Sequence, residues 1–127
     1  MDNTRLDAVL LVKKGVEKDF KVEWEWWRYM IDGKLFAALL HPSAQYDPEY
    51  AEQDLLTLKC DPVYSEQLRA EYSDILPGFY TDKRNWISIR LEGAVPDKLI
   101  VELCEHSYQL VLSKLTKKRQ REIQGLT

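Results

Sequence analysis

Long hydrophobic runs are absent from this chain of 127 residues. No stretch approaches the roughly 18 consecutive apolar residues that a membrane-spanning helix needs. The apolar patch near the N-terminus is only about five residues long and is flanked by acidic and basic residues, which is too short for the core of a signal peptide. We therefore expect a cytoplasmic protein that has no contact with a membrane.

Motifs of catalysis and metal binding are missing as well. Cys60 and Cys104 each stand in apolar sequence, which is typical of reduced thiols packed in a core. Neither these cysteines nor His41 and His106 have the spacing of a C-x-x-C or H-E-x-x-H site. There is also no glycine-rich phosphate loop and no G-x-S-x-G turn. We predict a protein that is not an enzyme and has no catalytic residues, no metal site and no cofactor.

Acidic residues slightly outnumber basic ones, which gives a formal net charge of −3. Domains that bind nucleic acid without selectivity are usually strongly basic, so this balance argues against that class. One basic stretch stands out at residues 114–121 (KLTKKRQR), where five of eight residues are Lys or Arg. It can contact nucleic acid, or it can be a helix end whose dipole favours cations, and we favour the helix end.

Cap and stop residues predict three helices. The first covers residues 4–14 and ends at Gly15. The second begins at Asp61, whose side chain can cap the helix, with Pro62 in the first position. The third begins at Pro96-Asp97 and keeps apolar residues at helical spacing through Leu115.

Alternating apolar residues predict five strands, over residues 20–31, 34–41, 54–60, 78–81 and 86–92. In the first strand the alternation slips at Trp26 and Trp27, which are adjacent and both large. Either a bulge lies there or the second half of the strand is covered on both faces. Asp32-Gly33 then predicts a tight hairpin turn.

The order of elements predicts an α+β fold. Helix, three strands, helix, two strands, helix is most simply an antiparallel sheet with the helices on one face, an α-β(3)-α-β(2)-α arrangement in two layers. No repeat or linker divides the chain, so we expect one domain over residues 1–127. The second face of the sheet should be at least partly open.

Several segments together resemble the MmcQ/YjbR family of small bacterial proteins. They are KKGVEKDFKVEW, WRYMIDGKLFA, LTLKCDP, LRAEYSDILPGFY, DKRNW, LEGAVPDKL and HSYQLVLSKL, and they span residues 11–117 in order. The resemblance implies the same α-β(3)-α-β(2)-α fold, akin to secretion chaperones and frataxin-like proteins. It also implies DNA binding as an expectation and supplies no catalytic residue. Asn85 departs from the His that many relatives carry before Trp86.

The open sheet face is the first candidate site. If Ile87, Ile89 and Leu91 point toward the helices, then Trp86, Ser88 and Arg90 point away from them. By the same alternation Thr57 and Lys59 point away, opposite to Leu56, Leu58 and Cys60. Trp27 and Tyr29 join this surface if the alternation shifts at Trp26.

An aromatic and basic sheet surface has three readings. It can stack bases and hold phosphates, or it can receive a peptide or a second protomer. In the third reading, residues 42–53 or the long helix cover the face and the tryptophans are core residues. The segment Lys83-Arg84-Asn85-Trp86 can likewise grip a phosphate or be a solvated turn with a packed Trp, which we favour.

We predict from this a binding protein rather than an enzyme. The candidate binding residues are Lys59, Lys83, Arg84, Trp86, Arg90 and Trp27. DNA is the first expected partner, and a protein or peptide bound to the same aromatic face is the alternative.

Overall fold

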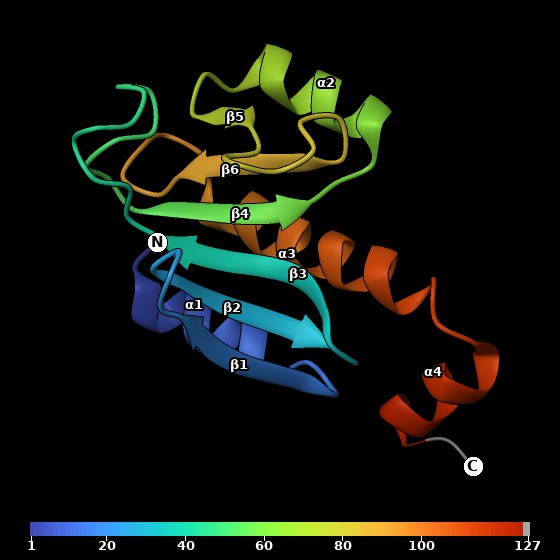
Figure 1. Cartoon of the computed structure of the whole chain (residues 1–127). Coiled ribbons are helices and arrows are strands. Elements are labelled where there is room, and N and C mark those ends of the chain that lie inside the picture. The colour runs from blue at the N-terminus through green and yellow to red at the C-terminus, as the bar shows by residue number, and fades with distance from the viewer. Residues whose placement is uncertain (126–127) are drawn as a thin grey trace.

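Residues 1–125 of this computed structural model form a six-stranded antiparallel sheet with helices packed on one of its faces (Figure 1). The strand order is β1-β2-β3-β4-β6-β5. The strands are β1 Val16–Lys21, β2 Trp26–Ile31, β3 Lys34–Leu40, β4 Leu55–Lys59, β5 Ile75–Pro77 and β6 Trp86–Arg90. The helices are α1 Asn3–Leu11, α2 Pro62–Glu71, α3 Asp97–Leu112 and α4 Lys117–Gln124. The predicted α+β class and antiparallel sheet are confirmed.

One face of the sheet carries the main core against the helices, and it is called the helix face below. Leu56, Leu58, Ile87 and Ile89 all point into it and are fully buried, as their alternation predicts. Polar groups also hold this face together. Ser107 of α3 donates a hydrogen bond to the carbonyl of Phe36 at 2.6 Å and accepts one from the backbone N–H of Lys59 at 3.0 Å.

The predicted first strand is in fact two strands. Residues 22–25 form a turn in which the N–H of Glu25 donates to the carbonyl of Lys21 at 2.7 Å. Glu25 adopts a left-handed φ of 60° to close it. The alternation of Val22 and Trp24 with acidic residues therefore belongs to a β1–β2 hairpin turn. This is why the sheet has six strands where the sequence predicts five.

The strand predicted over residues 78–81 is misplaced along the sequence. The strand lies earlier, at β5, and residues 78–81 turn back across the sheet. The N–H of Gly78 donates to the carbonyl of Trp86 at 3.0 Å, and the N–H of Phe79 donates to the hydroxyl of Ser88 at 2.9 Å. Because Ser88 supplies the acceptor, this segment follows the face of the sheet without becoming a strand of it.

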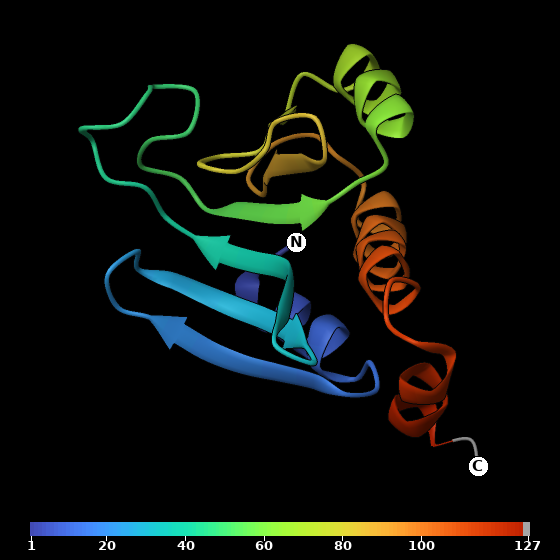
Figure 2. The ribbon, with the colours of Figure 1, turned by 45° about the vertical axis from the view of Figure 1, so that its right-hand side comes forward.

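The basic stretch at residues 114–121 does not extend the long helix. α3 ends at Leu112, and Thr116 caps a separate helix, α4, by accepting from the N–H of Arg119 at 3.1 Å. Arg119 then pairs with Asp32 in the β2–β3 turn at 3.0 Å. α4 continues beyond α3 along the same side of the molecule (Figure 2). Among residues 1–125, no helix has the length and apolar character to cross a membrane.

The second face of the sheet, called the cleft face below, is partly covered and partly open. Leu55, Leu76 and Phe79 bury a smaller core there together with Tyr50, which comes from the long connection at residues 42–53. The hydroxyls of Thr57 and Ser88 bond each other at 2.7 Å beneath it and are inaccessible to solvent. The reading in which residues 42–53 cover this face is therefore confirmed for its β4–β6 part. In Figure 2 this connection protrudes on the side away from α2 and α3.

Candidate functional site

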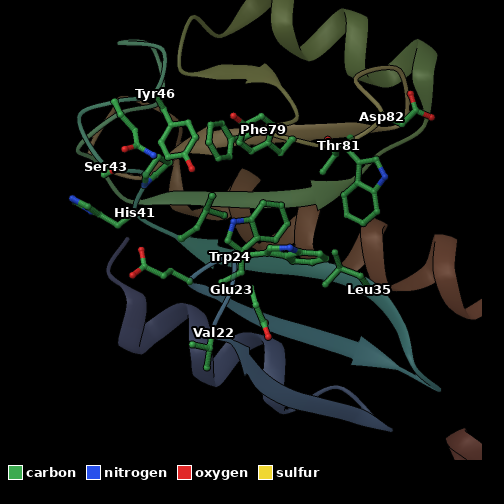
Figure 3. A pocket seen from close by; sticks show the side chains of 17 residues that line it. Val22, Glu23, Trp24, Leu35, His41, Ser43, Tyr46, Phe79, Thr81 and Asp82 are labelled. Atoms are coloured by element: carbon green, nitrogen blue, oxygen red, sulfur yellow. The ribbon is translucent and has the colours of Figure 1, made fainter.

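A cleft of about 620 Å³ lies on the cleft face, beside the part that the connection covers (Figure 3). Its walls are the β1–β2 turn at residues 22–25, the segment 40–46 after β3, and the segment 79–82 before β6. Six aromatic side chains line it: Trp24, Trp26, Tyr46, Phe79, Tyr80 and Trp86. This size and aromatic lining are typical of a site that binds an organic ligand or a short peptide segment.

Five of the six aromatic rings of the cleft stand in two groups, and Trp86 belongs to neither. Trp24 and Trp26 meet edge to face with ring centroids 5.4 Å apart. Tyr46 makes the same kind of contact with Phe79 at 5.3 Å and with Tyr80 at 5.5 Å. Such pairs hold the rings in fixed orientations, so the two walls are built before any ligand arrives.

Two of the wall segments contain left-handed backbone at residues other than glycine. Glu25 has a φ of 60° and Tyr80 a φ of 49°, and both line the cleft. This conformation costs a non-glycine residue about 1–2 kcal/mol. Side chains held at such positions are often functional, since a glycine there would be less strained.

Three apolar or aromatic residues on the rim of the cleft are unusually exposed to solvent. Val22 is 71% exposed, Trp24 is 53% exposed and Tyr80 is 71% exposed, and all three line the cleft. Trp26, whose ring contacts that of Trp24, is only 5% exposed. A buried aromatic floor with an exposed apolar rim is typical of surfaces that bind another molecule.

The charges on the cleft lining are acidic, and none of its described residues is Lys or Arg. Glu23 pairs with Lys21 at 3.5 Å. Asp82 accepts hydrogen bonds from the side chain of Asn85 at 2.6 Å and from the N–H of Arg84 at 3.0 Å, and these bonds lower the pKa of its carboxyl group. The site is therefore not built to hold a phosphate in its centre.

Trp86 is the one predicted binding residue that lines the cleft. It pairs in register with Lys59 at the end of β4. Burial, together with the nearby ammonium groups of Lys114 and Lys34, lowers the pKa of Lys59. Lys59 and Trp86 thus lie side by side, as the sequence predicts, but only Trp86 lines the cleft.

The other predicted basic residues do not gather around Trp86. Lys83 donates to the carbonyl of Gly78 at 2.8 Å, and Arg90 donates to the carbonyl of Ser73 at 3.3 Å and pairs with Asp74 at 3.6 Å. Both side chains therefore brace the chain around β5. Arg84 is exposed and lies in the turn before β6.

Trp27 lies on the opposite face from the cleft, as does Tyr29. Because adjacent strand residues point to opposite faces, Trp26 faces the cleft and Trp27 faces the helix side. There Trp27 packs on Phe20 with ring centroids 4.7 Å apart. Tyr29, on the same face, donates to Asp7 of α1 at 2.6 Å. The alternative in which Trp27 and Tyr29 join the surface of Trp86 is therefore wrong.

Sequence reasoning missed most of the cleft, including Trp24, Trp26, Tyr46 and Tyr80. The available signal was the irregular alternation at Trp26 and Trp27, which marks a change of direction rather than a bulge inside one strand. The aromatic content of the connection at residues 42–53 was a second signal, because a fully solvated connection has no need of two tyrosines.

The cysteines and histidines have structural surroundings. Burial raises the pKa values of the Cys60 and Cys104 thiols to about 12, so both stay protonated and unreactive. His106 accepts from the N–H of Asp61 at 3.2 Å, and burial lowers its pKa. His41 on the cleft rim contacts Asp54 at 3.0 Å. Over residues 1–125, no three His, Cys, Asp or Glu side chains gather as a metal site would require.

Comparison with known proteins places the chain in a family. The YjbR family model matches residues 11–110, which include all six strands and most of α3. The chain belongs to the YjbR family. "Uncharacterized protein YjbR" of Escherichia coli K12 is 26% identical over 111 residues, 87% of each chain. "Uncharacterized protein YyaQ" of Bacillus subtilis is 46% identical over 61 residues, which cover 48% of this chain and 51% of that protein.

Solved structures share the fold. A crystal structure of a Deinococcus radiodurans protein with a DUF419 domain superposes with a TM-score of 0.78 at 28% identity, covering 98% of this chain and 88% of that one. A Pseudomonas syringae protein superposes with a TM-score of 0.72 at 24% identity, covering 87% of this chain and 98% of that one. The names of these relatives state no ligand or reaction, so the function has to be argued from the cleft.

Proposed function

We propose that this YjbR-family protein is a non-enzymatic binding protein and that its aromatic cleft receives a segment of a protein partner. The observation that carries this proposal is the aromatic lining of a 620 Å³ cleft beneath an exposed apolar rim. Binding energy at protein interfaces is concentrated in a few aromatic side chains around well-packed pockets. Trp24 and Tyr80, on opposite walls, are the residues most suited to that role.

The chemistry of the lining favours a peptide over a nucleic acid. A groove that follows a phosphate backbone needs basic side chains along its length, and the described lining has none. The exposed side chains of Val22, Trp24 and Tyr80 offer apolar area to a peptide side chain. Removing apolar area from water is favourable by about 25 cal/mol per Å², and this free energy favours binding.

The test is a selection of random displayed peptides on the immobilised protein, followed by affinity measurements on the variants. Trp24→Ala and Tyr80→Ala should each weaken the selected peptides by about tenfold or more, the effect expected for a hot-spot aromatic. Trp27→Ala is the matched control, because Trp27 is 46% exposed but lies on the opposite face. Peptides that bind Trp24→Ala as well as the wild type, or that depend on Trp27, would contradict the proposal.

Nucleic-acid binding is the second candidate, and the pairing of Lys59 with Trp86 favours it. A base stacked on Trp86 would bring its phosphate toward Lys59. Fluorescence anisotropy with single- and double-stranded DNA at two salt concentrations tests this function. It requires an affinity that falls steeply with salt and a loss of binding in Trp86→Ala and Arg84→Ala. Absence of DNA binding at low salt would contradict this second function.

A further inference from the structure

The charged groups that line the cleft are carboxylates. Glu23 and Glu25 come from the β1–β2 turn, and Asp82 comes from the segment before β6 on another wall (Figure 3). A hydrogen bond from its own backbone N–H and the nearby ammonium of Lys21 lower the pKa of the Glu23 carboxyl, and hydrogen bonds from Asn85 and from the backbone lower that of Asp82. Both groups are therefore ionised at neutral pH.

The ring of Trp24 attracts cations. The ammonium of Lys21 lies 5.5 Å from its centroid, and the guanidinium of Arg28 lies 5.8 Å from it. The face of an aromatic ring carries partial negative charge, so a cation within about 6 Å of the centroid is stabilised. Trp24 is still 53% exposed with both cations in place. The ring therefore keeps surface that a cation from a ligand can reach.

Glu25 is the carboxylate beside this ring that lacks a basic partner. Arg28 donates two hydrogen bonds to Asp19, at 2.8 and 2.6 Å, and Lys21 pairs with Glu23 at 3.5 Å. Within residues 1–125, no basic side chain lies within 4.0 Å of the Glu25 carboxylate. Glu25 is exposed, lines the cleft and has a left-handed φ of 60°. An exposed carboxylate next to an aromatic ring is complementary to a cation that a ligand brings.

We propose that the cleft binds an arginine side chain of the partner segment, with the guanidinium over the exposed ring of Trp24 and in an ion pair with Glu25. A guanidinium is planar and weakly hydrated, so it stacks on aromatic faces, and its fork of N–H donors matches a carboxylate. Apolar side chains of the same segment then cover Val22 and Tyr80 on the rim. This inference rests on the proposed function and specifies the chemistry of the partner.

The experiment compares two probes of nearly the same shape, N-acetyl-phenylalanyl-arginine amide and its citrulline counterpart, in which an uncharged urea replaces the guanidinium. The readout is the set of four tryptophan indole N–H signals in the NMR spectrum of the labelled protein. Trp24, Trp26 and Trp86 line the cleft, and Trp27 on the other face is the internal control. The arginine probe should bind about fivefold more tightly than the citrulline probe and should shift the Trp24 signal most.

One pair of variants assigns that preference to a single carboxylate. Glu25→Gln should abolish most of the difference between the two probes, because the amide keeps the size of the side chain and removes its charge. Glu52→Gln is the matched control. Glu52 is also exposed and also has a left-handed φ, of 57°, but it is not among the described residues that line the cleft. A preference for arginine that survives Glu25→Gln, or that is lost equally in Glu52→Gln, overturns the inference.

The remaining outcomes separate this inference from the proposed function. Equal binding of the arginine and citrulline probes in the cleft overturns the arginine site and leaves the cleft as a peptide site. Tighter binding of the corresponding glutamate probe overturns the inference in favour of an acidic partner. No movement of the cleft signals with any probe also overturns it, and the selection of random displayed peptides then decides the proposed function separately.

Discussion

The two faces of the sheet are formed by the same strands but are covered by different parts of the chain. The helix face buries Leu56, Leu58 and their neighbours completely beneath α1 and α3. The cleft face is covered by irregular segments only over β4 and β6, and it leaves six aromatic side chains around a cleft. The helices bury their face over β4 and β6 but leave Phe20 and Trp27 of β1 and β2 partly exposed, whereas irregular segments cover the other face in patches. The face that is covered less completely is therefore the one left with a site.

The same contrast is visible in two buried serines, one on each face. Ser107 joins α3 to the sheet on the helix face through Phe36 and Lys59. Ser88 joins residues 78–81 to the sheet on the cleft face through Phe79 and Thr57. Each hydroxyl forms hydrogen bonds with two polar groups that would otherwise lack a partner. Substituting the two serines therefore tests the contribution of each face to stability and binding.

The largest expected effect is on the helix face. Leu56→Ala should lower the free energy of unfolding by about 2–5 kcal/mol, because it leaves a cavity among fully buried neighbours. Trp24→Ala removes a larger side chain that is half-exposed, and it should change stability by less than about 1 kcal/mol. Urea unfolding of both variants measures this difference. Equal losses would mean that the cleft wall is part of the cooperative core.

The serine pair should give the next largest effects. Ser107→Ala and Ser88→Ala should each cost about 1–3 kcal/mol, the penalty for a buried polar group left without its partner. Only Ser88→Ala should also weaken peptide binding, since it loosens the wall that holds Phe79 and Tyr80. Urea unfolding and peptide titration of the two variants check this. Weaker binding in both variants would contradict the separation of the faces.

A smaller effect of opposite sign is expected at the β1–β2 turn. Glu25→Gly should raise the free energy of unfolding by about 0.5 kcal/mol, because glycine adopts a φ of 60° without steric strain. Glu23→Gly is the control in the same turn, since Glu23 is not among the residues with positive φ, and it should give no gain. Thermal unfolding monitored by circular dichroism distinguishes the two, and a loss of stability in Glu25→Gly would refute the argument from strain.

The smallest expected effect is the pH dependence that Lys59 contributes. Its pKa is lowered in the folded protein from the usual 10.5, so folding disfavours its charged form. Its unfavourable contribution is complete below the folded pKa and is relieved as the pH rises toward 10.5. Relative to Lys59→Met, the wild type should therefore gain stability on the alkaline side. Parallel urea unfolding curves at neutral and alkaline pH test this, and an identical pH dependence in both proteins would contradict it.

Much of the fold could be predicted because its signals are local. Asp61 caps α2 by accepting from the N–H groups of Val63 and Tyr64, as the Asp-Pro pair predicts. Gly15 has a left-handed φ of 78° in the turn before β1, as a glycine at that position predicts, although α1 itself ends at Leu11 and not at residue 14. The alternation in β4 and β6 also gave the correct inward faces. Each of these features depends on a few neighbouring residues and the backbone they share.

The candidate site could be predicted only in part. Trp86 and Lys59 were found because regular strands fix which side chains share a face. Trp24 was assigned to a strand interior, because apolar alternation in a turn looks the same as alternation in a strand. One alternative grouped Trp27 with Trp86. It required a bulge at Trp26, and no bulge lies there. The turn at residues 22–25 therefore changed the expected places of both Trp24 and Trp27.

The sequence by itself determined the α+β class, the Asp61 cap of α2 and the inward faces of the central strands. The tertiary structure alone decided that Trp24, Tyr46 and Tyr80 line one cleft. The physical reason is distance along the chain. Periodicity and capping act within a few residues, whereas these groups come from segments 20 or more residues apart that are brought together by strand pairing and by the packing of irregular segments on the sheet.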